Sequence, residues 1–327
     1  MKRRTFIRLV GSVAAASMPL AALAKSKFPN RPIRLVIPFP PGGGFDAIGR
    51  PWADRVKSLL GTVVIENQGG GAGSIGSASV ARAKPDGYTI LMGGTTTLIT
   101  DALLKKRPLY NPIKDLAPIS NIAISAYALA INPTVPVHTL QEFVDHAKEN
   151  PRKLTYGTAG LGSLGHLTGE MFKSLTKTPD ILHVPYRGGG PAIVGALSGQ
   201  ISMVITGVTS QFLELHQSGK LRILAVTSPS RLIVAPDIPT AVEAGIPNMV
   251  SFQFIGLFAP RGTPRAIIDQ IGHASRTALA DENFKKMLLD SGFRPDADST
   301  PAKLAEYIAY DIRRWGPLIK EIGLKID

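Results

Sequence analysis

Residues 156–166 read YGTAGLGSLGH; they follow the short apolar run LTY (154–156) and lead into a helical pattern that begins at Ser163. A strand, a glycine-rich loop and a helix in this order form the repeating unit of parallel α/β sheets. Gly160, Gly162 and Gly165 also have the G-x-G-x-x-G spacing of a dinucleotide-binding turn. The stretch therefore predicts an α/β fold and leaves open whether the glycines serve a dinucleotide or another ligand.

Three further loops have the same composition and lie between an expected strand and an expected helix. They read PFPPGGGFD (38–46), QGGGAGSIG (68–76) and PYRGGGPA (185–192). Ligands of open parallel sheets bind outside the carboxyl ends of the strands, where such loops lie. Glycine lets backbone N–H groups approach an anion, and the start of the following helix adds a partial positive charge. A carboxylate or a phosphate suits these loops, although βα turns also favour glycine for structural reasons alone.

The alternation of short β-branched runs and helical patterns continues along the chain and predicts two modules. The chain is expected to enter the second module near residue 125 and to leave it near residue 254. Strands are expected at 33–39, 63–67, 88–92, 127–131, 154–156, 181–186, 201–206, 221–227 and 252–260. Helices are expected at 46–60, up to about 82, from 139, at 163–175, 192–197, 211–217 and 303–315, and an irregular crossing at 229–247.

The N-terminal residues predict export from the cytoplasm. MKRRTFIRL carries four basic residues and no acid, and an apolar run follows that ends in Ala22-Leu23-Ala24. These features predict a signal peptide over residues 1–24. Arg3-Arg4 leaves twin-arginine and ordinary Sec export both open. No later run of about 18 apolar residues occurs, so we expect a soluble mature protein of 303 residues.

Composition narrows the class of partner. The chain has no cysteine, which excludes disulfides and thiolate chemistry. Removing the four basic residues of the signal peptide lowers the net charge from +13 to +9. The basic residues are scattered and aromatic residues make up only 6% of the chain, so nucleic acid is the least favoured partner. An anionic small ligand, a membrane surface, or no ligand-related cause at all accounts equally well for the positive charge.

The residues that follow the two G-x-G-x-x-G copies give the dinucleotide interpretation little support. After the copy at 71–76, the next strand ends in Gly93-Gly94-Thr95, without an acid to bind a ribose. After the copy at 160–165, the next strand ends at Arg187, which suits a 2′-phosphate. An exported nicotinamide-dependent oxidoreductase that uses the GLGSLG turn therefore stays open as an alternative function.

No catalytic or metal-binding constellation is recognisable. Ser163 lacks the first glycine of a G-x-S-x-G elbow, and the six histidines show no H-x-x-x-H spacing. We expect no catalytic residue, no metal and no cofactor. His166 either donates a hydrogen bond to an anion or packs on a helix face, and Asp46 either caps a helix or faces the ligand.

Seven stretches, in this order, resemble a known family. They are FPNRPIRLVIPFPPGGGFD, VVIENQGGGAGSIG, ARAKPDGYTIL, LTYGTAGLGSLGHLTGEMF, HVPYRGGGPAIVGALSGQI, GKLRILAVTS and IGLFAPRGTP. Together they resemble the solute receptors of tripartite tricarboxylate transporters, also called Bug-type periplasmic binding proteins. The resemblance covers essentially the whole mature chain.

The resemblance implies a two-lobed, type II periplasmic-binding-protein fold, in which each lobe is a mostly parallel sheet flanked by helices. Lobe 1 would comprise residues 25–125 and 255–327, lobe 2 residues 126–254, and a hinge would join them. The implied function is a periplasmic, non-enzymatic receptor that closes on a small carboxylate and delivers it to membrane permease subunits. We expect a monomer without nucleic acid; a ligand sensor for a two-component system uses the same lobes and is a further alternative.

The resemblance places the ligand contacts in the glycine-rich loops, largely through backbone N–H groups and bridging water. The residues expected to line the site are Phe39, Pro40, Gly43, Gly44, Phe45, Asp46, Thr95, Thr96, Tyr156, Thr158, Ala159, Gly160, Ser163, His166, Tyr186, Arg187, Gly188, Thr206, Gly207 and Phe254. The family often has Thr at the position of Phe45 and Trp at that of Phe254. The uncharged run Thr206-Gly207-Val208 offers no partner for an ammonium group, so we expect a plain or aromatic carboxylate and not an amino acid.

Overall fold

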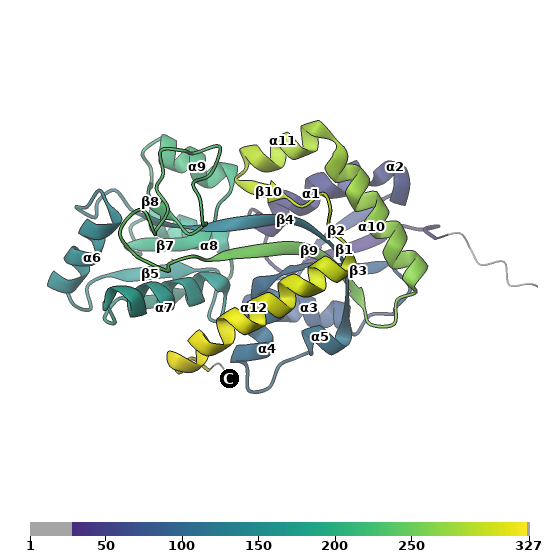
Figure 1. Cartoon of the computed structure of the whole chain (residues 1–327), viewed down its shortest axis with the longest axis horizontal. Coiled ribbons are helices and arrows are strands. Elements are labelled where there is room, and N and C mark those ends of the chain that lie inside the picture. The colour runs from purple at the N-terminus through teal and green to yellow at the C-terminus, as the bar shows by residue number, and fades with distance from the viewer. Residues whose placement is uncertain (1–27, 326–327) are drawn as a thin grey trace, which may run out of the picture.

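The computed structural model describes residues 28–325, and of residues 99–102 it describes the backbone alone. The expected signal peptide, residues 1–24, lies outside the described residues. Strands and helices alternate along the chain and form one continuous mixed sheet with helices on its faces (Figure 1). None of the described helices is long and apolar enough to cross a membrane.

The strands form two groups, which confirms the expected α/β architecture. In the first group β1 (Ile33–Ile37) pairs in parallel with β2 (Val63–Asn67) and β3 (Thr89–Gly94). In the second group β5 (Thr155–Thr158) pairs in parallel with β6 (Leu182–Pro185) and β7 (Met203–Gly207). The strands β8 (Arg222–Val226) and β10 (Phe293–Pro295) complete the sheet.

Two antiparallel strands connect the groups. The strand β4 (Leu116–Ile131) pairs with β9 (Phe252–Pro260) along its first part and with β7 and β8 along its last part. Figure 1 shows β4 and β9 running side by side from one half of the molecule to the other. These two strands form the only sheet connection between the groups within the described residues.

The sequence pattern predicted only the last five residues of β4. The strand has 16 residues, and all but one of them are buried. The part that the prediction missed, 116–126, is rich in Ala and Ser and contains Pro118, so it lacks the β-branched composition of an isolated strand. Pairing on both edges stabilises it instead, which is tertiary information that local composition does not contain.

The predicted helices are present with small shifts at their ends. The helix α1 begins two residues before the predicted start, because its first turn uses the glycines of the loop. The helices are α1 (Gly44–Arg55), α2 (Lys57–Leu60), α3 (Ser74–Ala81), α4 (Asp101–Leu104), α5 (Pro112–Asp115), α6 (Leu140–Glu149), α7 (Leu164–Thr176), α8 (Gly189–Leu197), α9 (Ser210–Gln217), α10 (Arg265–Ala280), α11 (Glu282–Asp290) and α12 (Pro301–Glu321). The 3-10 turn η1 (Gly71–Gly73) and the π-helix η2 (Thr96–Thr100) precede α3 and α4.

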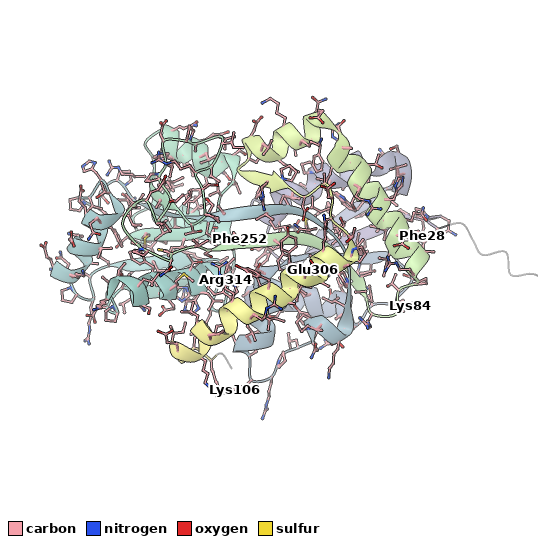
Figure 2. The ribbon with its side chains drawn as sticks, in the orientation of Figure 1. Phe28, Lys84, Lys106, Phe252, Glu306 and Arg314 are labelled. Atoms are coloured by element: carbon pink, nitrogen blue, oxygen red, sulfur yellow. The ribbon has the colours of Figure 1, made fainter. Side chains whose placement is uncertain are left out.

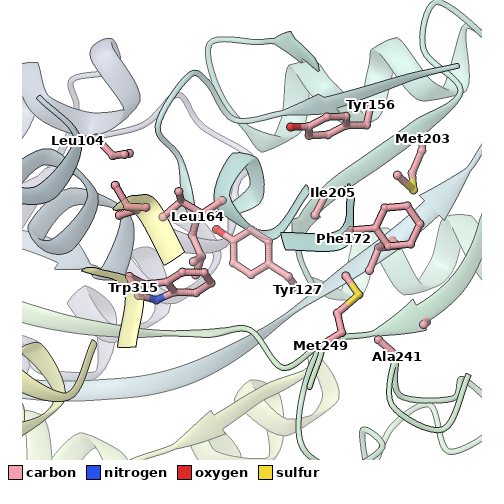
Figure 3. Close-up of a cluster of buried hydrophobic side chains, with 14 of the residues drawn as sticks. Leu104, Tyr127, Tyr156, Leu164, Phe172, Met203, Ile205, Ala241, Met249 and Trp315 are labelled. Atoms are coloured by element: carbon pink, nitrogen blue, oxygen red, sulfur yellow. The ribbon is translucent and has the colours of Figure 1, made fainter. Parts of the chain in front are cut away.

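The C-terminal helix α12 packs its apolar stripe onto the sheet, as the spacing of its apolar residues predicts. Leu304 and Trp315 are fully buried, and Tyr307, Ile308 and Ile312 pack against the same cluster. Trp315 lies beside Tyr127 of β4 and Leu164 of α7 (Figure 3). The helix therefore contributes to a core that contains residues of both strand groups.

We expect Trp315→Ala to lower the free energy of unfolding by about 3–5 kcal/mol, because it removes a fully buried indole and leaves a cavity. Tyr310, on the same helix and 47% exposed, provides the matched control. Tyr310→Ala should change stability by less than about 1 kcal/mol. Urea unfolding followed by circular dichroism measures both, and equal effects would contradict the packing described.

Candidate functional site

A small cavity lies where the strand ends of the two groups meet. Its volume is about 40 Å³. Nine of the twelve lining residues are among those expected from the sequence. The lining comprises Phe39, Pro40, Gly43, Gly44, Phe45, Thr96, Ala159, Thr206 and Gly207, together with Tyr127, Gly189 and Gln253. None of these side chains is charged, so any charged ligand group in this cavity must be stabilised by neutral donors.

Asp46 shapes the loop of the first strand group from behind. Its carboxylate accepts hydrogen bonds from Arg50 Nε at 2.9 Å, from Asn67 Nδ2 at 3.0 Å and from the Gly42 N–H at 3.3 Å. Burial acts to raise the pKa of Asp46, but these three hydrogen bonds outweigh it and hold the pKa below its usual value. Asp46 therefore neither occupies the N-cap position, which is Gly43, nor lines the cavity.

Backbone N–H groups are the donors that the cavity offers. Gly43 and Gly44 stand at the start of α1, and Gly189 is the first residue of α8. Within the described residues no acceptor pairs with the N–H groups of these three glycines. The first N–H groups of a helix lack intrahelical partners, and the helix dipole makes this end attractive to an anion. The two helix starts come from different strand groups, so an anion between them would contact both.

A hydrogen bond also joins the two groups directly across the cavity. The N–H of Leu164, at the start of α7, donates to Thr96 Oγ1 at 3.1 Å. The Tyr127 hydroxyl hydrogen-bonds to the Thr96 side chain and to Gln253 Oε1, the latter at 3.3 Å. Complete burial raises the pKa of Tyr127 to about 12, so the hydroxyl stays protonated at neutral pH. Thr96 is therefore the point at which the two groups are hydrogen-bonded to one another.

His166 supports the second glycine-rich loop and does not line the cavity. Its Nδ1 accepts a hydrogen bond from the Gly162 N–H at 3.1 Å. Its ring stacks on His183 with 3.9 Å between the ring centroids, and His183 Nε2 lies 2.7 Å from Thr158 Oγ1. Burial lowers the pKa of His166 to about 4 and that of His183 to about 3. Both rings are neutral at pH 7, and the Gly162 N–H is used within the protein.

Several expected site residues have other partners. Ser163 caps α7 by accepting from the His166 N–H, and Tyr156 donates its hydroxyl to Glu170 at 2.6 Å. Phe254 is buried and stacks on Tyr307. Thr95, next to Thr96, donates to Asp311 of α12 at 2.7 Å. These residues hold the loops and strands in place without lining the cavity.

A larger, positively charged cavity adjoins the first. Its volume is about 390 Å³, and Phe39 and Ala159 line both cavities. The walls come from the η1 loop at 70–73, from 159–161 and from 185–187, so Gly160, Tyr186 and Arg187 lie here. Lys105 and Arg187 are its charged residues. Gly188 lies close by, since a Cβ at this position would be 3.1 Å from Pro40 Cδ.

Three lining residues have no signal in the sequence. Tyr127 and Gln253 lie on β4 and β9, where the pattern predicts buried strands and no functional side chains. They face each other only because residues 126 positions apart in the chain belong to adjacent strands. Gly189 lies in the predicted loop PYRGGGPA, and its place at a helix start was the available signal.

The comparisons with known proteins agree with this geometry. Residues 48–324 match the model of the tripartite tricarboxylate transporter family receptor. The chain is 34% identical over 324 residues to a UPF0065 protein from the tcbD-tcbE intergenic region of Pseudomonas sp. strain P51, covering 98% of this chain and 95% of that one. It belongs to the family of tripartite tricarboxylate transporter receptors.

Solved structures of the family share the fold. The periplasmic binding protein BugD is 31% identical, with a TM-score of 0.87 and coverage of 91% of this chain and 99% of that one. The Rpa4515 protein of R. palustris, solved with adipate, is 31% identical, with a TM-score of 0.86 and the same coverage. The expected two-lobed periplasmic-binding-protein fold is thereby confirmed, and the chain is a solute receptor of this transporter family.

For this receptor the glycine spacing at 160–165 has a structural explanation. A Cβ on Gly165 would lie 2.5 Å from the Ile205 carbonyl oxygen, so only glycine lets α7 pack this closely on β7. Gly160 has φ +136°, a conformation that L side chains rarely adopt. No group of histidines and carboxylates in the described part of the chain is arranged to hold a metal.

We expect Thr96→Val to weaken carboxylate binding by about tenfold. Loss of the hydroxyl leaves the Leu164 N–H without its acceptor when the groups close, at a cost of about 1–3 kcal/mol. Thr96→Ser keeps the hydroxyl and should bind like the parent. Calorimetry uses the acid of an adipate, malate and benzoate panel that stabilises the parent most; equal affinities for the valine and serine variants would contradict the role of Thr96.

Asp311 should make stability depend on pH with an unusual sign. Burial raises its pKa to about 6, although Thr95 and Arg314 oppose the shift. Between about pH 4 and 6 the folded protein therefore binds more protons at this carboxyl than the unfolded chain does, and its contribution to stability falls as pH rises. Asp311→Asn should be about 3 kcal/mol more favourable, relative to the parent, at pH 7 than at pH 4.

Urea unfolding of the parent and Asp311→Asn at both pH values measures this difference. Comparison at each pH removes the contributions of other carboxylates, including Asp46. An offset between the two proteins that does not change with pH would show that Asp311 is ionised normally.

Proposed function

We propose that this receptor binds a small carboxylate between lobe 1 (25–125 and 255–327) and lobe 2 (126–254) and delivers it to the permease subunits of its transporter. The observation that carries the proposal is the pair of helix starts, α1 and α8, whose unpaired glycine N–H groups line one uncharged cavity. A buried carboxylate costs several kcal/mol unless each oxygen is hydrogen-bonded. Amide donors from both lobes meet this need only when the lobes are together.

Ligand entry requires the lobes to separate. The inner cavity of about 40 Å³ is small, and the Leu164–Thr96 hydrogen bond joins the lobes across it. Bending of β4 and β9 would open the cleft, and closure would place one carboxylate at the helix starts. The remainder of the ligand would lie toward the adjoining cavity, beside Arg187 and Lys105. The adipate bound by the related Rpa4515 is an acid of this kind.

The lining favours a plain carboxylate over an amino acid. No Asp or Glu lines either cavity among the described residues, so an ammonium group would find no charged partner. Phe39 and Phe45 stack on each other at 4.9 Å and give the inner cavity one aromatic wall. We propose an aliphatic or aromatic acid as the ligand, no cofactor and no enzymatic activity.

The remaining steps concern the whole protein. We propose export by the signal peptide 1–24, action in the periplasm and a monomeric receptor. A receptor that binds its solute and passes it on needs no reacting group, and the uncharged lining of the inner cavity agrees with this role.

Gly43→Leu should abolish carboxylate binding without unfolding the protein. Gly43 has φ −92° and ψ 175°, which any residue adopts, and a Cβ there meets no atom within 4 Å. The leucine side chain would instead occupy the cavity, and we expect a loss of affinity of about 100-fold or more. Gly316→Ala, also at a glycine with free space, is the control and should bind normally.

Thermal shift and calorimetry with the acid panel test the proposal, and reduced nicotinamide dinucleotides serve as the opposing probe. A carboxylate that binds the parent and Gly316→Ala, but not Gly43→Leu, is the expected result. Normal binding by Gly43→Leu would move the site elsewhere. Dinucleotide binding without carboxylate binding would replace the proposal with the oxidoreductase alternative.

A further inference from the structure

A second cavity lies on the opposite face of the β4–β9 pair. Tyr127 and Gln253 line the ligand cavity, whereas their strand neighbours Ala126 and Phe252 line a cavity of about 300 Å³. Successive side chains of a strand point to opposite faces, so the two cavities are on opposite sides of the connecting strands. We call the second cavity the hinge groove.

Both lobes contribute walls to the hinge groove. One wall is the loop 228–234, which follows β8 in lobe 2, and the other is the segment 289–294 at the end of α11 and the start of β10 in lobe 1. The walls touch beside the groove, because a Cβ on Gly292 would be 2.7 Å from Val208 Cγ1. The width of the groove therefore depends on how the lobes are oriented about β4 and β9.

The groove combines an apolar interior with positive charge. Its floor and walls include Ile124, Phe252, Leu289 and Phe293, and no acidic side chain lines it. Its two charged residues are arginines. Arg231 is paired with Glu243 at 2.9 Å, whereas Arg294 is exposed and has no ion-pair partner within the described residues. An arginine without a partner at the edge of an apolar cavity suits a molecule with an apolar body and one anionic group.

Phe252 gives the floor a rigid position. The guanidinium of Arg314, on α12, lies 5.3 Å from the centre of its ring, and Figure 2 shows the two side chains next to each other. A cation over an aromatic face holds the ring against rotation. The floor is therefore fixed by α12, while the two walls belong to lobes that can move.

We propose that the hinge groove is a second binding site, that it takes an amphipathic monocarboxylate, and that an occupant favours the closed arrangement of the lobes. A volume of about 300 Å³ lies at the lower end of small-molecule sites. An acid with a chain of about eight carbons has an apolar body for the interior and a carboxylate for Arg294. Octanoate is the probe that fits this description.

The coupling follows from the position of the groove behind the hinge and rests on the lobe closure of the proposed function. When the lobes separate at the ligand cleft, their opposite edges approach each other and narrow the groove. A molecule that fills the groove opposes this movement and so stabilises closure. By linkage, groove occupancy and cleft occupancy must then strengthen each other to the same extent.

The absence of cysteine makes a direct test possible, since one introduced thiol is the only labelling site. Ser230→Cys, on the exposed wall of the groove, carries an environment-sensitive fluorophore; Ser58→Cys, exposed on α2, carries the same label as the control. Octanoate should change the fluorescence at position 230 with saturation and leave position 58 unchanged. Octanol and propionate, which lack the charge or the apolar body, should have at least about tenfold weaker effects.

Two variants test the assignment of the site. Arg294→Gln should weaken octanoate binding about tenfold and Arg294→Lys much less, because the lysine keeps the charge. Gly43→Leu should leave the response at position 230 intact, since it blocks only the ligand cleft. Loss of the response in Gly43→Leu, equal binding of octanol, or no effect of Arg294→Gln would each overturn the proposal.

The effect on the lobes is measured without any cleft ligand. Energy transfer between labels at Ser58→Cys and Ser174→Cys, exposed on lobes 1 and 2, should report a shorter distance when octanoate is added. Octanoate binding without this change would refute the coupling. Failure of the acid panel to bind the cleft would instead refute the proposed function and leave the groove result standing.

Discussion

The constraint on which this structure depends is that a buried carboxylate must be surrounded by hydrogen-bond donors that the protein itself does not use. Secondary structure pairs nearly every backbone N–H group. The first turns of helices are the regular exception, and α1 and α8 present theirs to one cavity. Glycine at these positions keeps side chains out of the way. The fold of two strand groups is what brings two such helix starts face to face.

Donors that are left unpaired must still be held in position, and the two lobes do this with different chemistry. In lobe 1 the ionised Asp46 binds Arg50, Asn67 and the Gly42 N–H, so a charge network anchors the loop. In lobe 2 a neutral His166 accepts from Gly162 and stacks on His183. Each anchor lies behind its loop and leaves the cavity uncharged. Both residues stand in the glycine-rich motifs, which explains why the sequence indicates them as site residues although they act one layer away.

How much was predictable follows from how local each feature is. The strand, loop and helix around Pro40 and around Ala159 are encoded within about a dozen consecutive residues, and both loops line the cavity. Thr95 and Thr96 are adjacent, yet one binds Asp311 of α12 and the other the Leu164 N–H. Composition cannot separate such neighbours, because the direction of each side chain depends on distant packing. Tyr127 and Gln253 were missed for the same reason.

The register of β4 decides which side chains reach the ligand. Asn121 pairs with Gly256 and Ala123 pairs with Ile255, so β4 has one extra residue, a bulge, at this point. Side chains alternate along a strand, and one extra residue exchanges the two faces for everything that follows. The bulge therefore places Tyr127 in the ligand cleft and Ala126 in the hinge groove. Without it Tyr127 would lie behind the hinge and Thr96 would lose a partner. A single inserted residue, unmarked in the composition of LAPISNIAISA, thus determines both faces of the connecting strands.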